Sequence, residues 1–281
     1  MAGRRARRAR PPRTRSRHFL RTSTLAAELV GDACLGPDDL VLDLGAGSGR
    51  LTAELARIAR EVVAVELDPG LAAKLRGRWP NVRVVEGDAV ELPLPRVPFR
   101  VVANIPFDRT TDLLRRLLDD PRVPLDRADL VVEWGVALKR ALPWPSTVND
   151  VRWGAWYRFS VSRRLTRADF APPPLVDAGV LVIERRARPL VPEREAMRYA
   201  AFVARGFRHG LRAVAGRRAP GGVQPRELDP HRWAELYLSV RGGGTGAGAS
   251  SAAAVASPAR AGAARPNGGT GRSDRNPSAP Q

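Results

Sequence analysis

The sequence predicts an α/β fold in which a doubly wound, mostly parallel sheet is followed by a small helical C-terminal unit. Short apolar or β-branched runs alternate with segments of helical periodicity between residues 41 and 141. Strands separated by helices are typical of a parallel sheet with helices on both faces. The 281 residues, 43% of them hydrophobic, are enough for one sizeable core and a small appendage.

The expected elements follow one another with short connections. Helical segments are predicted at 23–35, 50–59, 69–78, 110–119 and 135–141. Strands are predicted at 41–44, 62–65, 82–85, 100–103 and 130–133. Two later strands, 159–165 and 179–184, are joined by a loop with three prolines. Because such a loop does not provide a crossover helix, we expect these two strands to form an antiparallel pair at the end of the sheet.

The C-terminal unit is predicted from helical spacing after residue 191. Apolar residues recur at this spacing from Pro192 to about Ala215. Five arginines are interleaved with them: Arg194, Arg198, Arg205, Arg208 and Arg212. A shorter helical pattern, from Trp233 to Val240, follows Asp229-Pro230, which is a typical helix start. We therefore expect a small helical unit with a basic face.

A glycine-rich turn follows the first predicted strand. Asp43 precedes Gly45, Gly47 and Gly49, which occupy alternate positions before a helical segment. Glycines in such a turn permit positive φ and let a ligand approach the backbone. The turn lacks the Lys-Ser/Thr end of a phosphate loop, and Arg50 stands where a dinucleotide turn has glycine. Because Asp43 would repel a pyrophosphate, we expect a ligand that is cationic at its reactive end.

Two further acidic residues stand at the ends of the next predicted strands. Glu66 follows 62–65, and its carboxylate can accept both hydroxyls of a ribose. Asp88 follows 82–85, and it can accept a hydrogen bond from the exocyclic amine of an adenine. A cation, a ribose and an adenine together describe S-adenosylmethionine. Any one of these residues alone would be an ordinary strand-end acid.

The segment Asn104-Ile105-Pro106-Phe107 follows the strand 100–103 at the same edge of the sheet. The Asn104 oxygen and a backbone carbonyl can each accept one N–H of an exocyclic amine, and Pro106 has no N–H to compete. Two acceptors would free the nitrogen lone pair for attack on a methyl group, so that positioning supplies most of the catalysis. Phe107 offers a face on which a base can stack. Asn104 and Phe107 are therefore the predicted catalytic residues.

The formal net charge of +18 indicates a polyanionic partner, with nucleic acid the first candidate. Residues 1–17 contain eight arginines, a density that favours a disordered arm able to contact RNA. GC-rich coding also favours arginine over lysine. The three histidines and the single cysteine, Cys34, give little support for a metal site, and Cys34 fits a core position. We expect no metal, no membrane segment and a cytoplasmic location.

These motifs, together with Phe170-Ala171-Pro172-Pro173-Pro174-Leu175-Val176-Asp177, resemble the erythromycin-resistance (Erm) rRNA adenine N6-methyltransferases over residues 16–241. The resemblance implies a Rossmann-like class I methyltransferase domain and S-adenosylmethionine as methyl donor. It implies one adenine of 23S rRNA as acceptor, and resistance to macrolide, lincosamide and streptogramin B antibiotics. It further implies a monomer.

The resemblance also assigns roles to single residues. His18, Leu20, Asp43, Gly45, Gly47, Glu66, Asp88 and Asn104 are implied to bind the cofactor. Phe107 and Phe170 are implied to bind the substrate. The family usually has Gln where Arg17 stands, so Arg17 has no assigned role.

The implied domains are an arm at 1–15, a methyltransferase domain at 16–188, an RNA-contacting helical domain at 189–241 and a disordered tail at 242–281. Two alternatives stay open. Small-subunit (16S) rRNA adenine dimethyltransferases have Asn-Leu-Pro-Tyr at the position of Asn104 to Phe107 and a larger C-terminal domain. A catalytically inactive RNA-binding protein would explain the charge but gives no reason for the intact acidic residues.

Overall fold

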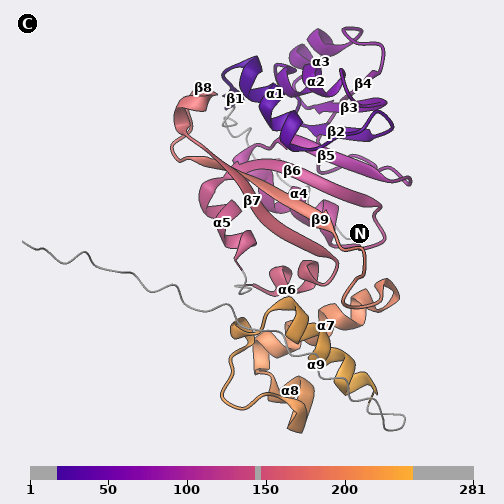
Figure 1. The fold of residues 1–281 in the computed structure, drawn as a ribbon, viewed down its shortest axis with the longest axis vertical. Coiled ribbons are helices and arrows are strands. Elements are labelled where there is room, and N and C mark those ends of the chain that lie inside the picture. The colour runs from indigo at the N-terminus through magenta and orange to yellow at the C-terminus, as the bar shows by residue number, and fades with distance from the viewer. Residues whose placement is uncertain (1–17, 143–146, 243–281) are drawn as a thin grey trace, which may run out of the picture. The chain divides into compact units, whose positions relative to one another are not determined.

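The computed structural model describes residues 18–142 and 147–242, so the expected arm at 1–15 and the expected tail beyond Gly242 lie outside the described residues. A seven-stranded mixed sheet has the order β4-β3-β2-β5-β6-β9-β7 (Figure 1). Its strands are β2 (Leu40–Leu44), β3 (Glu61–Glu66), β4 (Val82–Glu86), β5 (Phe99–Asn104), β6 (Leu125–Glu133), β7 (Tyr157–Leu165) and β9 (Ala178–Arg185).

The direction of the strands confirms the predicted sheet. Strands β2 to β6 run parallel, whereas β9 is antiparallel to both β6 and β7. The two late strands are thus the expected antiparallel pair, with β9 inserted between β6 and β7. Their burial differs accordingly: the first six residues of β9 are all buried, while exposure alternates along the edge strand β7.

Helices cover both faces of the sheet. They are α1 (Ser23–Asp32), α2 (Arg50–Leu55), α3 (Pro69–Leu75), α4 (Thr110–Leu118), α5 (Trp134–Ala141) and α6 (Val148–Gly154). Because side chains alternate along a strand, Val41 and Val62 pack with α1 and α2, whereas Leu42 and Val63 belong to the cluster that contains α4. Burial on both faces explains why inner strands such as β3 carry apolar residues at consecutive positions.

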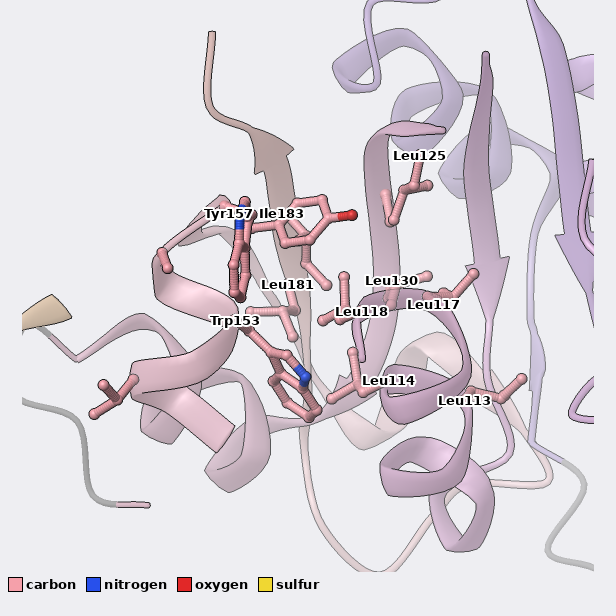
Figure 2. Close-up of a cluster of buried hydrophobic side chains, with 14 of the residues drawn as sticks. Leu113, Leu114, Leu117, Leu118, Leu125, Leu130, Trp153, Tyr157, Leu181 and Ile183 are labelled. Atoms are coloured by element: carbon pink, nitrogen blue, oxygen red, sulfur yellow. The ribbon is translucent and has the colours of Figure 1, made fainter. Parts of the chain in front are cut away.

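Helix α4 contributes four leucines to a cluster of buried hydrophobic side chains (Figure 2). Its buried leucines are Leu113, Leu114, Leu117 and Leu118, which recur at i, i+1, i+4 and i+5 on one face. They belong to one cluster with Leu130 of β6, Leu181 of β9 and Trp153 of α6. The Trp153 indole N–H donates to Asp119 Oδ1 over 2.8 Å, so this buried ring has its polar atom paired.

A second, two-stranded sheet joins distant parts of the chain. Strand β1 (Phe19–Leu20) pairs antiparallel with β8 (Phe170–Ala171), with Phe19 opposite Ala171 and Leu20 opposite Phe170. The backbone N–H of Arg21 continues the pairing by donating to the Asp169 carbonyl over 2.7 Å. This pairing fixes the start of the described chain beside the loop that precedes β9.

The C-terminal helices are α7 (Ala196–His209), α8 (Arg212–Ala215) and α9 (Pro230–Gly242). The helical spacing predicted from Pro192 to about Ala215 is divided between α7 and α8, because α7 ends at Gly210, whose φ is 85°. Trp233 of α9 lies over Gly206, where an added Cβ would come within 2.5 Å of the ring. The close approach of α7 and α9 therefore depends on a glycine at position 206.

Two other predictions are corrected by the observed exposure. Cys34 is exposed, at φ 52° in the turn after α1, and is not a core residue. Met197, part of the expected apolar pattern of α7, is 86% exposed, and the buried face of that helix carries Tyr199 and Val203. No helix of residues 18–142 or 147–242 has the length and apolarity needed to cross a membrane.

Candidate active site

A cavity lies at the carboxyl ends of β2, β3 and β5, where the sequence places the glycine turn and the strand-end polar residues. The predicted residues that line it are His18, Gly45, Gly47, Glu66, Asp88, Asn104 and Phe107. Ligands of open α/β sheets bind at this edge. The cavity therefore brings together most of the side chains that the sequence singled out, from positions as far apart as 18 and 107.

The glycine turn has the backbone conformation that its composition predicts. Gly45, Gly47 and Gly49 have φ values of 86°, 57° and 80°. The N–H groups of Gly45 and Ala46 both donate to the Val65 carbonyl, over 2.8 and 3.0 Å. A Cβ at position 47 would lie 2.7 Å from the Phe19 ring, so the glycine is needed both for its φ and for the packing of Phe19.

Glu66 is held by two backbone donors. Its Oε2 accepts from the Gly47 N–H and its Oε1 from the Asp68 N–H, each over 2.8 Å. The side chain lines the cavity while the residue is only 8% exposed. Since each carboxylate oxygen can accept a second hydrogen bond, the fixed carboxylate is suited to receive a diol.

Asp88 has one neighbour that sequence reasoning missed. Its Oδ1 accepts from the Val90 N–H over 3.0 Å, and its Oδ2 accepts from Arg109 Nη2 over 2.8 Å. Arg109 itself lines the cavity. Only its position just after Asn104-Ile105-Pro106-Phe107 could have drawn attention to it. The ion pair fixes the Asp88 carboxylate and places a cation at the wall of the cavity.

Asp43 lies beneath the glycine turn and faces α2. It is 1% exposed, its Oδ2 accepts from the Thr52 hydroxyl over 2.6 Å, and its Oδ1 is buried without a hydrogen-bond partner among the described residues. Burial, with a further contribution from the nearby Glu66 carboxylate, raises the pKa of Asp43 to about 7. A buried acid with a spare oxygen is suited to offset a positive charge on the cavity side of the turn.

Asn104 is oriented by the N-terminal segment. Its Nδ2 donates to the His18 carbonyl over 2.7 Å. Since a carbonyl can only accept, the amide nitrogen must face His18, which leaves Asn104 Oδ1, unpaired among the described residues, to accept from a ligand. The following turn is closed by the Arg109 N–H, which donates to the Pro106 carbonyl over 2.8 Å.

Two aromatic rings lie beside this acceptor. Phe107 and His18 have ring centroids 5.9 Å apart at an interplanar angle of 39°, and both residues line the cavity. His18 Nδ1 is hydrogen-bonded to the Pro172 carbonyl over 2.9 Å. The cavity wall next to Asn104 is thus a pair of ring surfaces, one of which is tied to the loop that follows β8.

Three predicted residues do not line the cavity: Asp43, which is buried beneath the glycine turn, Leu20 and Phe170. Leu20 is 3% exposed and Phe170 is fully buried, and they face each other across the β1–β8 pair within the core cluster of α1 and α2. Alternation along a two-residue strand directs Phe19 to the glycine turn and Leu20 to the core. A direct contact of the Phe170 ring with substrate is therefore not supported by its position.

The cavity lining contains acceptors suited to two parts of S-adenosylmethionine: the Glu66 carboxylate for the ribose and the Asp88 carboxylate for the adenine amine. The buried Asp43 carboxyl lies beneath the turn and outside this lining. No group of three His, Cys, Asp or Glu suited to a metal ion occurs in the part of the chain that the structure describes.

The family model for ribosomal RNA adenine dimethylase matches residues 13–214. The mycinamicin-resistance protein MyrB of Micromonospora griseorubida is 36% identical over 240 residues, which cover 79% of this chain and 76% of that protein. An rRNA adenine N-6-methyltransferase of Corynebacterium diphtheriae is 39% identical over 173 residues, covering 59% and 68%.

Solved structures agree with these sequence matches. The 23S rRNA methyltransferase ErmE superposes with a TM-score of 0.69 at 28% identity and covers 79% of this chain and 99% of its own. A dimethyladenosine transferase from Plasmodium falciparum shares the fold, with a TM-score of 0.65 at 18% identity over 81% and 98% of the two chains. The chain therefore belongs to the ribosomal RNA adenine dimethylase family, a family of S-adenosylmethionine-dependent methyltransferases.

Proposed function

We propose that this protein transfers a methyl group from S-adenosylmethionine to N6 of one adenine in 23S rRNA, and that it thereby gives resistance to macrolide, lincosamide and streptogramin B antibiotics. The observation that carries the proposal is the orientation of Asn104, whose amide nitrogen is held by the His18 carbonyl so that Oδ1 is left to accept from an amine. The names of MyrB and ErmE support the ribosomal target and the resistance.

Under this proposal the chain mainly positions its reactants. Asn104 Oδ1 and a backbone carbonyl accept the two N–H groups of the adenine, and the ring of Phe107 stacks on the base. The cofactor supplies a methyl group attached to a positively charged sulfur. Glu66 and Asp88 hold the ribose and the adenine of the cofactor, and Asp43 offsets its charge from beneath the turn. Because the methylated amine is a strong acid, its extra proton leaves without a dedicated base.

Variants of the two catalytic candidates test this assignment. Asn104→Ala should lower the turnover rate with radiolabelled S-adenosylmethionine and 23S rRNA far more than it lowers affinity for S-adenosylhomocysteine, because the lost acceptor matters most as the nitrogen becomes tetrahedral. Phe107→Tyr keeps an aromatic face and should stay active, whereas Phe107→Ala should not. Full activity of Asn104→Ala would contradict the proposed role.

A second candidate function has its own support. The small-subunit methyltransferase A of Chlorobium phaeobacteroides is 31% identical over 198 residues, which cover 68% of this chain and 72% of that enzyme. Primer extension on both rRNAs from a susceptible host that expresses the wild-type protein separates the two, and growth on erythromycin should follow the 23S modification. A stop confined to 16S rRNA would exclude the 23S assignment, and no methyl transfer to either RNA would identify an inactive RNA-binding protein.

We also propose that a basic face formed by α7, α8 and the turn Glu193–Glu195 before α7 contacts rRNA phosphates. Arg194, Arg198, Arg205, Arg208 and Arg212 are all exposed, and none has a carboxylate partner among the described residues. The Arg-rich segment 1–15, which lies outside the described residues, would add to this contact. Changing three of the five arginines to Gln should flatten the dependence of RNA affinity on salt, because fewer counterions are released. An unchanged slope would remove this face from the interface.

The remaining assignments belong to the same proposal. A monomer acting in the cytoplasm, where ribosomes are found, fits a substrate that is itself a large particle. The division into domains at 188/189 is also a proposal. Trp156 donates its indole N–H to the Val191 carbonyl over 2.9 Å and meets Tyr199 edge-on at 5.9 Å, so the two parts share one core. Sedimentation of the purified chain would test the monomer.

A further inference from the structure

The loop between β8 and β9 begins at the mouth of the cavity. Its first residue, Pro172, accepts a hydrogen bond from His18, and His18 lines the cavity beside Phe107. Leu175 lies three residues further on. Three extended residues span roughly 10 Å, so Leu175 is close enough to contact the nucleotides next to a base that occupies the cavity.

The loop carries exposed apolar side chains at its tip. Leu175 is 92% exposed and Val176 is 48% exposed, although the same chain buries the other leucines of this region. Leu20 and Leu165, which flank the loop in space through β1 and β7, are 3% and 2% exposed. Isolated exposed leucines are common, so exposure alone gives Leu175 no role unless its backbone is also held in place.

The far end of the loop is anchored. Asp177 Oδ2 accepts from Arg164 Nη2 over 2.7 Å, and its Oδ1 accepts from the Arg167 N–H over 3.2 Å. The Asp177 carbonyl accepts from the Trp134 N–H over 2.9 Å. Pro173 and Pro174 restrict the backbone between the two anchors. The Leu175 side chain is thus presented to solvent from a loop that is fixed at both ends.

Positive charge surrounds the exposed tip. A hollow beside the loop is lined by Arg21, Arg167, Pro173, Pro174 and Leu175, among others. Arg21 Nη2 donates to the Phe170 carbonyl over 3.3 Å and Arg167 Nη1 to the Leu175 carbonyl over 3.5 Å. Asp177 also lines the hollow and attracts Arg167, but neither guanidinium has a carboxylate oxygen within 4 Å among the described residues, so both retain donors for an anion.

We propose that this loop is the base-extrusion wedge of the enzyme: Leu175 enters the base stack at the place vacated by the target adenine, and Arg21 and Arg167 bind the flanking phosphates. The inference rests on the proposed function, since an adenine must leave its stack before its amine can reach a methyl group. Apolar side chains are inserted into nucleic-acid stacks in this way, and phosphate contacts fix the register. An apolar tip between two cations suits RNA better than an apolar protein surface.

Two RNAs with the same target adenine test the proposal. One is a 23S hairpin in which the adenine is stacked, and the other is a short unstructured oligonucleotide with the same flanking bases. Leu175→Ala should lower kcat/KM at least tenfold on the hairpin and less than twofold on the oligonucleotide. Leu175→Met should restore most of the hairpin activity. Val97→Ala is the matched control, because Val97 is 52% exposed and precedes β5 at the opposite edge of the sheet from the cavity.

Fluorescence reports the extrusion itself. With 2-aminopurine in place of the target adenine of the hairpin, the wild-type protein should raise the emission, and Leu175→Ala should raise it much less at saturating protein. Arg21→Gln and Arg167→Gln should each lower the slope of log affinity against log salt by about 1. Affinity for S-adenosylhomocysteine should be unchanged in all variants, which shows that they are folded.

The outcomes separate the wedge from the function on which it rests. Suppose that the wild-type protein is active, and that Leu175→Ala lowers kcat/KM equally on both RNAs or on neither. That result would overturn the wedge and leave the proposed function standing. A wild-type protein that methylates neither RNA nor intact 23S rRNA would overturn both.

Discussion

Replacing Asp43 with Asn should change how the stability of the protein depends on pH. In the folded chain the Asp43 carboxyl is buried, with one oxygen paired to Thr52 and one without a partner, and its pKa is raised from the ordinary 3.8 to about 7. Between these two pH values, the folded state therefore keeps the Asp43 proton, whereas the unfolded state has lost it. Unfolding free energy should fall as pH rises through this window and level off above about pH 7.

The size of this effect on the unfolding free energy follows from the shift in the pKa of Asp43. A difference of about three pH units at 1.36 kcal/mol per unit corresponds to about 4 kcal/mol of stability lost between pH 4 and pH 8 through this one group. Asp43→Asn is nearly isosteric and cannot ionise, so the variant should lack this loss. Measured without cofactor, the unfolding free energy of the variant relative to wild type should therefore rise by about 1 kcal/mol for each pH unit between 4 and 7.

Urea unfolding followed by circular dichroism at four pH values gives the comparison directly. Asp126→Asn, on the exposed start of β6, controls for the removal of one acidic residue. Wild-type and Asp43→Asn stabilities that run parallel from pH 5 to pH 8 would refute the reasoning. The same variant should bind S-adenosylmethionine more weakly than wild type at pH 8, because the carboxylate that offsets the positive charge has been removed.

Four further variants test the cavity, the glycine turn and the C-terminal core. Glu66→Ala and Asp88→Ala should each weaken S-adenosylhomocysteine binding by about 1–3 kcal/mol in calorimetry, and unchanged affinities would remove both from the site. Gly47→Ala should lower both stability and cofactor affinity, since its Cβ would lie 2.7 Å from Phe19 at a φ of 57°; a melting temperature equal to wild type would contradict this. Trp233→Ala should cost about 3–5 kcal/mol of unfolding free energy in urea titrations.

The sheet was predictable because its inner strands are buried on both faces. The strands containing Val41, Val62 and Val101 were each located to within one or two residues from their apolar runs alone. The glycine turn and the strand-end residues followed, since parallel strands carry their functional residues at one edge. Asn104 and Glu66 accordingly lie at the same cavity.

Features that depend on contacts between two residues or on tertiary packing could not be predicted from the sequence pattern. The pairing of Leu20 with Phe170 has no periodicity to detect, and it is what turns Phe170 into the core. Arg109 gains its role only from its distance to Asp88, which no spacing rule encodes. Gly210 stands within an apparently continuous helical pattern, and only its positive φ shows that the helix ends there.

The place of β9 in the sheet has a consequence for how the chain folds as it is made. Among the described strands, β7 pairs with β9 alone, so residues 157–165 have no partner until residues 178–185 have been synthesised. Until then the edge of β6 is also open, and open edges are where growing chains associate wrongly. By contrast, the residues that line the cavity span 18–113 and precede both strands. Strands β2 to β5 can therefore pair before β7 and β9 have been made, whereas the segment that carries His18 must wait for β8, its partner strand, to be synthesised.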